Sequence, residues 1–581
     1  MKKIIPSIVF LLFVAIGILA QGVVPETLKN GLVPSRYNRN ALTVIVLDNN
    51  GSYMTDIKNA TGNLQIPEKY DDNLLDIRYI PSSSTADQIL QTIYNFKIPN
   101  KILAKWFSRK PSGEFDMSLI ATRGLYNATA GDMIKASSSK IGLDKIKDAG
   151  KALVDNSYIQ VLDIRNVMSM QEYYDKQDAA NRATAANTGK EFKPVKRTQN
   201  GWKGDVTSYL FKITPNAVDT LFDKMWIYDD DNQGMKSEKK NLFDYAKFGF
   251  SFVMSATANA DGTQYNPSQL LAPKVQLTRD QLFDKLVNNA LEQTMQVLET
   301  KYEPFRVKTS VYAIHPVGAK IGTKEGISID QRYFIFENIQ NKSGEVVSKQ
   351  QGVVRVSKVA NNSIVATTVN TELSKFYQTA GKHLETGMTM QQRNDYGLGI
   401  SAGLGSLSGG MGGFYLKAEE NLAVLSRMFM GAKNPIGITQ LKLFGSYAFD
   451  AATYPNDNNT YAFGRFQIGL SKGFYFMRSF SVAPFLAYGV EKATWGDSSN
   501  DYNINTAFLN IGAYATVNIT HNIQVVGTAN YYILVGNAYT ETKNSDDTTT
   551  STDLGFMYDD SYSGFTGRSG LAIDLGLRIE F

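Results

Sequence analysis

Histidine and cysteine, the side chains that most often carry proton transfer, nucleophilic attack and metal binding, are scarce in this chain. Only three histidines occur among 581 residues, and His315, His383 and His521 are spread over different predicted segments. Cysteine is absent, which excludes thiolate metal sites, disulfides and a lipid-bearing cysteine. We therefore expect no catalytic residue, no cofactor site, no metal site and no enzymatic activity.

Three short motifs come near to known chemistry without completing it. Residues 229–234 place acidic side chains at the first and third positions of a calcium loop, but Lys240 holds the twelfth, where a bidentate carboxylate is required. Ser137-Ser-Ser-Lys140 matches a Ser-x-x-Lys pattern only within a run of serines. The glycines and lysines of residues 318–326 lack the spacing that wraps a phosphate. An acidic turn, with weak calcium binding left open, and ordinary loops are the favoured interpretations.

The C-terminal end of the chain carries the strongest positive signal. In the last eleven residues the odd positions are all apolar, whereas the even positions are small or charged. Successive side chains of a strand point to opposite faces, so this segment predicts a sheet with one apolar face. Its length suits a tilted strand crossing a bilayer, where only a closed barrel satisfies the backbone. The predicted membrane-facing residues are Leu571, Ile573, Leu575, Leu577, Ile579 and Phe581.

Further segments between residues 396 and 581 repeat this alternation, and their lipid face includes Leu509, Ile511, Val525 and Ile533. Seven segments are clear, and an eighth is expected within residues 412–431. Its frame is ambiguous, because one apolar set fits a short strand and a second set requires an extended one. The first set is Phe414, Leu416 and Ala418, and the second is Leu422, Val424 and Met428. Short connections alternate with long polar ones, as in outer-membrane barrels.

The interior of an eight-stranded barrel is just wide enough for its own side chains, so a bulk diffusion pore is not expected. The charged residues predicted to point inward should pair with one another or meet water as a polar plug. They are Lys442, Arg465, Glu491, Asp574, Arg578 and Glu580. The long loop before the last strand is acidic, and its Asp546, Asp547, Asp559 and Asp560 are candidates for contacts outside the cell.

This C-terminal pattern resembles the small eight-stranded outer-membrane barrel family (OmpA- and OmpX-like). Phe581, with Ile579 and Leu577 behind it, resembles that family's C-terminal assembly signal. The resemblance implies outer-membrane lipid and the barrel assembly machinery as partners. A soluble β-sandwich or a lipocalin-like barrel also alternates, but in those folds the apolar face points inward.

The N-terminal part has a different character. Residues 1–20 indicate a secretory signal peptide, and residues 21–300 a periplasmic α/β region of one or two subdomains. Within it, Ala41–Leu47 predicts a buried strand and Thr278–Glu299 predicts a core-facing helix that begins with a capping box.

The formal charge of the chain is unevenly divided between the C-terminal part and the residues before it. Residues 396–581 hold 11 Lys and Arg against 15 Asp and Glu, net −4, so the preceding residues carry +9 if the whole chain is to total +5.

Residues 301–390 predict a small β module. The order of its glycines and strands is similar to the SH3-like module of relatives of the curli secretion lipoprotein family, although the lipid-bearing cysteine of that family is missing. An α/β region, a β module and a barrel at residues 396–581 are thus expected in sequence.

The favoured function is an outer-membrane protein whose barrel anchors a large periplasmic region that binds an envelope partner, for attachment, assembly or export. One alternative is an oligomeric export conduit built from the periplasmic domains, and another is a barrel-tethered periplasmic hydrolase. Nucleic-acid binding is not expected, because no dense Lys/Arg cluster with interleaved aromatic residues occurs.

Overall fold

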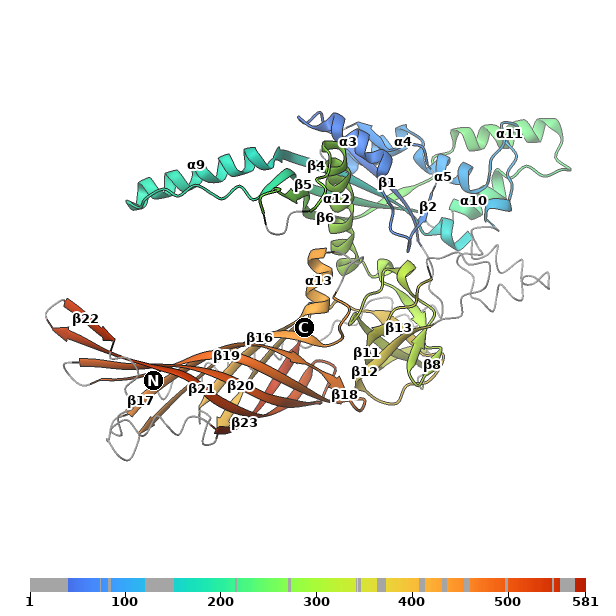
Figure 1. Cartoon of the computed structure of the whole chain (residues 1–581). Helices are drawn as coiled ribbons and strands as arrows, with labels where there is room; N and C mark the ends of the chain where they lie inside the picture. The colour runs from blue at the N-terminus through green and yellow to red at the C-terminus, as the bar shows by residue number, and fades with distance from the viewer. Residues whose placement is uncertain are drawn as a thin grey trace.

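The computed structural model contains three sheets that follow one another along the chain (Figure 1). It describes residues 40–581 except 74, 82–84, 121–150, 215–216, 270–272, 341, 343–345, 363–372, 407–412, 431–435, 454–459, 497–499, 546–547 and 554–569. The predicted signal peptide, the Ser137–Lys140 motif and the loop aspartates Asp546, Asp547, Asp559 and Asp560 lie outside the described residues. The combination of α/β, small β and barrel parts confirms the predicted fold class.

The first sheet has six strands in the order β2-β1-β4-β5-β6, with β3 also paired to β1. The pairings of β1 are parallel, whereas β4, β5 and β6 form an antiparallel meander. The strands are β1 (Ala41–Asp48), β2 (Asp71–Asp72), β3 (Tyr79–Pro81), β4 (Ser157–Ser169), β5 (Gln199–Ile213) and β6 (Phe250–Tyr265). The apolar run from Ala41 is buried almost throughout, as predicted, because helices cover both faces of β1.

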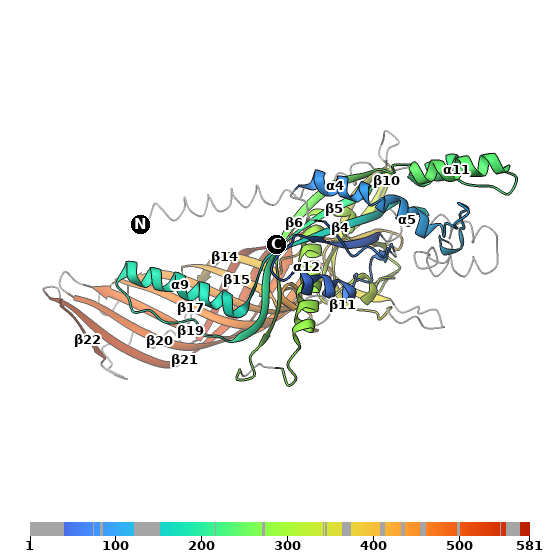
Figure 2. The ribbon, with the colours of Figure 1, turned by 90° about the horizontal axis from the view of Figure 1, so that it is seen from above.

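Two apolar cores lie on the two faces of this sheet. Helices α3 (Met54–Ala60) and α12 (Arg279–Lys301) cover one face, and α4 (Ala86–Asn95), α5 (Ile98–Trp106), α10 (Ala217–Lys224) and part of α11 (Gln233–Tyr245) cover the other. The predicted capping box of α12 is confirmed, since Thr278 and Gln281 exchange hydrogen bonds at its start. Helix α9 (Met170–Thr188) projects from the sheet as an arm (Figures 1 and 2). Within the described residues, no helix is both long and apolar enough to cross a membrane.

The second sheet belongs to the β module, a name used here for residues 307–392. Its strand order is β7-β13-β10-β11-β12-β9-β8, and it encloses a core of its own. The strands are β7 (Lys308–Ser310), β8 (Ala313–Ile314), β9 (Val317–Ala319), β10 (Arg332–Gln340), β11 (Val346–Lys358), β12 (Ser374–Gly381) and β13 (Thr389–Gln392). The likeness to the curli secretion family stays a prediction.

The third sheet closes on itself. Strand β17 pairs with β16 on one side and β19 on the other, so eight described strands form a continuous antiparallel ring. They are β14 (Leu398–Ser406), β15 (Phe414–Asn421), β16 (Leu441–Thr453), β17 (Thr460–Lys472), β19 (Phe480–Gly496), β20 (Asn500–Asn518), β21 (Ile523–Ser545) and β23 (Gly570–Glu580). Short β18 (Phe474–Tyr475) and β22 (Thr548–Asp553) extend the sheet at its two ends. The predicted eight-stranded barrel is confirmed.

The sequence left open how far the strand within residues 412–431 extends, and in the structure β15 ends at Asn421. The chain does not continue as a strand through Leu422, Val424 and Met428 but forms helix α13 (Leu422–Met430). The side chain of Asn421 accepts hydrogen bonds from the backbone N–H groups of Ala423 and Val424 and so caps this helix. Leu, Ala and Met favour helix, so the apolar residues here follow helical rather than strand spacing.

The outer face of the barrel is apolar. Leu575, Leu486 and Leu571 expose 63%, 55% and 50% of their surface, although a soluble fold would bury such side chains. The other predicted membrane-facing residues also point out of the ring: Ile573, Leu577, Ile511 and Ile533 are exposed, and Ile579, Phe581, Leu509 and Val525 are half-buried. Alternate residues such as Asn510, Tyr514 and Arg578 are buried inside. The ring therefore has the inside-out polarity of a membrane barrel.

We predict that Leu575→Arg weakens barrel folding by about 2–4 kcal/mol, since a cation at the middle of the lipid face is costly. The measurement is heat-modifiable electrophoretic mobility and membrane yield, with Val275→Arg, at an exposed position of the N-terminal part, as the control of equal charge. Equal yields of folded barrel for both variants would contradict the assignment of this face to lipid.

Candidate functional site

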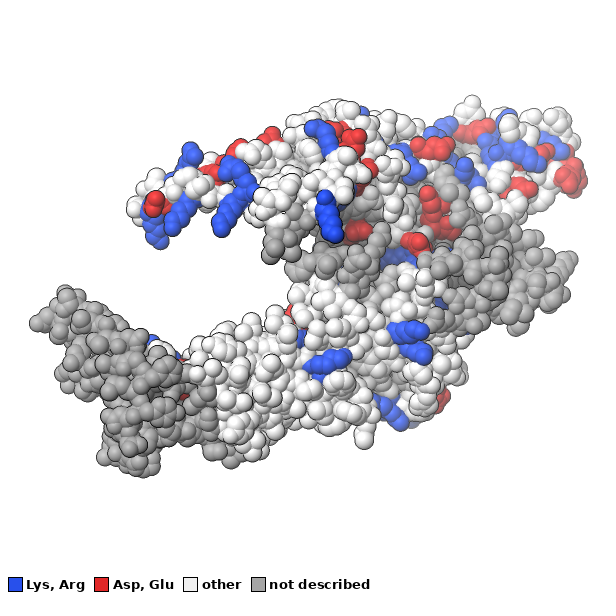
Figure 3. All heavy atoms as spheres, viewed as in Figure 1, with Lys and Arg blue, Asp and Glu red and all other residues white. Residues whose placement is uncertain are grey.

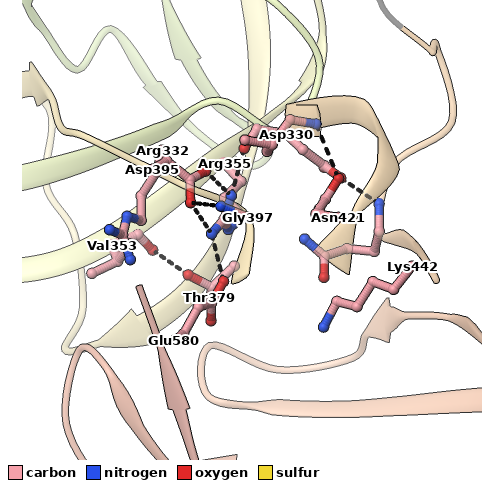
Figure 4. Close-up of polar contacts among 12 residues, drawn as sticks. Asp330, Arg332, Val353, Arg355, Thr379, Asp395, Gly397, Asn421, Lys442 and Glu580 are labelled. Atoms are coloured by element: carbon pink, nitrogen blue, oxygen red, sulfur yellow. Dashed lines mark hydrogen bonds and ion pairs between the residues drawn. The ribbon is translucent and has the colours of Figure 1, made fainter. Parts of the chain in front are cut away.

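The β module contacts one end of the barrel, at the mouth formed by the start of β14, the end of β23 and the turns around α13 and β18 (Figure 1). Polar side chains from both partners meet there and are buried (Figure 4). We call this group the mouth cluster; its members are Asp330, Arg355, Tyr377, Asp395, Asn421, Gln440 and Glu580. It is the best-defined arrangement of charged residues in the described chain.

Arg355 joins the two parts directly. Its guanidinium donates from Nη1 to Asp395 Oδ2 at 2.5 Å, and from Nη2 to Glu580 Oε1 at 2.5 Å and to Asp395 Oδ1 at 3.2 Å. Arg355 lies on β11 of the β module, whereas Glu580 ends the last barrel strand. Arg355 is 1% exposed, so this ion pair is withdrawn from water, where breaking one partner leaves a costly buried charge.

Asp330 forms the second junction. It is fully buried and adopts a left-handed backbone with φ 62°, a conformation that Asp tolerates better than most residues. Its Oδ2 accepts from Asn421 Nδ2 at 2.8 Å and from the backbone N–H of Gln440 at 2.5 Å, both on the barrel side. Its Oδ1 accepts from the hydroxyl of Tyr377 at 2.6 Å. One carboxylate of the β module thereby holds both ends of the α13 connection.

The interior of the barrel continues this network away from the mouth. The carboxylate of Glu419 forms ion pairs with three cations: Arg578 Nη2 at 2.7 Å, Lys442 Nζ at 2.8 Å and Lys417 Nζ at 3.2 Å. Arg578 also donates to Gln524 at 2.5 Å. Five of the six charged residues predicted to point inward are thus paired, as the polar-plug hypothesis expects. They are Lys442, Arg465, Glu491, Arg578 and Glu580.

Beyond this layer Arg465 pairs with Glu491 at 2.6 Å and lies 3.9 Å from the centre of the Tyr532 ring. A cavity of about 50 Å³ remains between the two layers, bordered by Lys417, Arg465, Asn530 and Asp574 among others. Such a volume holds a few water molecules. In the described residues, therefore, the barrel interior is occupied mainly by paired charges and contains no wide channel.

Burial and neighbouring charges shift the pKa values of two members of the mouth cluster, Asp395 and Tyr377. Burial alone would raise the pKa of Asp395, but Arg355 and Arg332 beside it hold that pKa below its ordinary value. Burial raises the pKa of Tyr377, and the neighbouring Asp330 carboxylate raises it further. Asp395 is accordingly charged and Tyr377 is a neutral donor near neutral pH.

Other candidates from the sequence do not assemble into a site. Asp231 of the acidic turn accepts Lys239 at 2.6 Å and the backbone N–H of Tyr228, so its carboxylate closes the start of α11. His315 and His383 are exposed, and His521 packs on Phe334. Among the described residues no group of three or more His, Cys, Asp or Glu side chains could hold a metal.

The residues of these networks that were not predicted from the sequence include Asp330, Arg355, Asp395 and Glu419. One signal was available for Arg355, because it interrupts the apolar run Val353-Val-Arg-Val356, and a charge inside a buried strand requires a partner. Nothing local identifies that partner, since Glu580 is 225 residues away.

We predict that Arg355→Gln loosens the barrel mouth, because Asp395 and Glu580 then lose the buried cation that they share, at a cost of about 3–5 kcal/mol. Hydrogen exchange of the amides of β11 should become at least about a hundredfold faster, since each factor of ten corresponds to about 1.4 kcal/mol. Arg182→Gln on the arm is the matched control. Unchanged exchange in β11 would show that the ion pair does not hold the junction.

A second prediction concerns acid. The folded-state pKa of Asp395 lies below its ordinary value of 3.8, so its stabilisation is complete above that value and is lost as pH falls through the lowered pKa. We expect β11 protection to be equal at pH 7 and pH 5 and to fall below about pH 4. Asp395→Asn should lower protection at pH 7 and flatten the acid step. Protection that falls already between pH 7 and pH 5 would contradict this assignment.

Comparison with known proteins concerns the fold alone. No protein-family model matches the chain, and no curated protein does. Solved structures similar to it include a major outer membrane protein from Thermus thermophilus (13% identity, TM-score 0.24, covering 32% of this chain and 98% of that one). A second is the attachment invasion locus protein of Yersinia pestis, with 14% identity and a TM-score of 0.20, covering 32% of this chain and 97% of that one. A third is the outer membrane protease OmpT from Escherichia coli, with 10% identity and a TM-score of 0.15, covering 44% of this chain and 94% of that one. The closed ring, its apolar outer face and its paired interior give the C-terminal third the architecture of a small outer-membrane β-barrel.

Proposed function

We propose that this protein is a non-enzymatic outer-membrane anchor that holds its N-terminal α/β part in the periplasm to bind an envelope partner. The single observation that carries the proposal is the buried Arg355–Glu580 ion pair, which fastens the β module across the mouth of the barrel. An anchor needs such a rigid junction between the barrel and the parts of the chain that precede it. An even number of strands puts both ends of the barrel chain on one side of the membrane, and the mouth cluster and the β module lie at that end.

The rigid connection extends beyond the β module. Gln391 and Lys308 of the module contact Glu303, directly after α12, at 2.7 Å and 3.0 Å. Asn394 donates to the carbonyl of Thr300 at 3.1 Å, within the last turn of α12. Because α12 packs along the first sheet, a partner bound to that sheet is mechanically linked to the membrane.

The arm is the element best suited to contact a partner. Helix α9 buries only Met170, Tyr174 and Asp178, yet its shape is strongly fixed. Ser169 and Glu172 form a capping box, and Arg197 of the returning segment donates to Asp175 at 2.7 Å and to Asp178 at 3.2 Å. A solvent-exposed helix with so many local restraints presents a preorganised surface, which lowers the entropy cost of binding.

The chemistry of the arm indicates what it contacts. In Figure 1 the arm points to the same side as the barrel, and Figure 3 shows both basic and acidic side chains along its length. Charged side chains such as Glu172, Lys176 and Arg182 are costly in hydrocarbon. We therefore infer that the arm contacts water, headgroups or a protein partner rather than acyl chains.

We predict that a photo-crosslinking amino acid at Arg182 or Thr188 of the arm gives a discrete crosslinked product in cells. The same probe at exposed Lys101 of α5 is the control and should give none. Products from all positions alike, or from none, would contradict partner binding by the arm.

Native mass and planar-bilayer conductance of the detergent-extracted protein separate the anchor from the oligomeric conduit. The anchor predicts a single chain and no measurable ion current, because paired charges fill the barrel. A ring of chains with a large conductance would favour the conduit instead.

A further inference from the structure

Three arginines from separate segments converge where the β module adjoins the barrel mouth. Arg306 follows α12, Arg332 begins β10, and Arg393 follows β13. The backbone N–H of Arg393 donates to the carbonyl of Arg332 at 3.0 Å. The guanidinium groups of both residues lie against the ring of Phe334, at 5.8 Å for Arg332 and 5.3 Å for Arg393. We call this group the arginine cluster.

The arginine cluster lacks a counter-charge of its own. Arg306 donates to the carbonyls of Glu299 and Thr300, and Arg332 donates to the carbonyl of Asn394 at 2.7 Å. All of these acceptors are neutral. Within the described part of the chain, none of the three arginines makes an ion pair with a carboxylate. The carboxylates whose charge reaches them are engaged elsewhere: Asp395 and Glu580 pair with Arg355, and Glu303 pairs with Lys308.

Several donors of the cluster are buried and unused. Arg332 is 6% exposed, and its Nε and Nη1 have no acceptor among the described residues. The Nε of Arg393 is also buried and has no acceptor among the described residues. Buried guanidinium donors without an acceptor are unfavourable, so an arrangement that keeps them signals a group that is bound at times.

Charge repulsion within the cluster agrees with this reading. Burial and then the positive charge of Arg306 lower the pKa of Arg393 to about 10, with Arg332 acting in the same direction. Burial likewise lowers the pKa of Arg332 and of Arg306. A bound anion would reverse these effects by supplying the missing negative charge.

The surroundings are those of the lipid headgroup level. His521, in the turn between β20 and β21, packs on Phe334 with 5.9 Å between ring centres. In the same turn Ile519 is 62% exposed, and Tyr396, which leads from Arg393 into the barrel, is 55% exposed. Exposed apolar and aromatic residues at the end of a barrel are typical of the membrane interface.

We propose that the arginine cluster binds a phosphate group at the periplasmic membrane surface, supplied by an anionic phospholipid headgroup or by a soluble phosphate ester. Arginine suits this ligand because its planar fork donates two parallel hydrogen bonds to phosphate oxygens. The half-buried Arg306 and Arg393 make the first contact, and the buried Arg332 supplies charge from behind. This site does not depend on the proposed partner binding by the arm.

The test uses full-length protein in detergent and native mass spectrometry with three probes: phosphatidylglycerol, diacylglycerol with the same acyl chains, and glycerol 3-phosphate. The variant Arg306→Gln/Arg393→Gln removes two half-buried charges, and the control Lys375→Gln/Lys382→Gln removes two exposed charges elsewhere on the module. Heat-modifiable mobility shows that each barrel is folded. We expect phosphatidylglycerol to bind wild type and the lysine variant at least about tenfold more tightly than the arginine variant.

Each probe has a decisive outcome. Competition of glycerol 3-phosphate with phosphatidylglycerol at equal affinity would support the site and identify a soluble ester as its ligand, whereas weaker competition would identify the lipid. Equal binding of diacylglycerol and phosphatidylglycerol would overturn the proposal, because acyl contact alone would explain it. Equal retention of phosphatidylglycerol by folded arginine variant and wild type would also overturn it.

Discussion

The pairing of Arg355 with Asp395 and Glu580 is the constraint on which the rest of the architecture depends. None of these charges can remain buried without the others, because an unpaired buried charge costs several kcal/mol. Glu580 reaches its position only when β23 closes the barrel, and Arg355 only when the β module has folded. Burial of Glu580 in the barrel and of Arg355 in the β module therefore each requires the other residue, so the barrel and the β module behave as one unit.

This coupling determines what the barrel can do. Inside it, four cations face four carboxylates: Lys417, Lys442, Arg465 and Arg578 against Glu419, Glu491, Asp574 and Glu580. A filled interior with balanced charge stabilises the barrel without lining a path for solute. Charged groups that could contact other molecules therefore lie outside the hydrocarbon, and the arginine cluster, with its unused donors, is one such group.

The predictable and unpredictable parts of this structure divide according to the range of the interactions. Leu575 and Arg578 could be placed on opposite faces because strand side chains alternate, and α12 could be bounded because Thr278 and Gln281 cap it locally. Helix α13 was missed since its cap, Asn421, is also the last residue of a strand. The mouth cluster could not be predicted at all, because the partners of Arg355 and Asp330 lie on other units and only the closed barrel brings them near.

The position of the charges follows from the same reasoning. Hydrocarbon admits paired charge inside a barrel but not on its outer face, so the excess positive charge of the chain must lie on the parts before residue 396, where the formal balance is +9. Anionic headgroups and polymers are abundant at such a membrane surface and attract basic segments. Under the proposed function, the arginine cluster at the barrel mouth suits a barrel-anchored protein that holds its N-terminal part against an anionic surface.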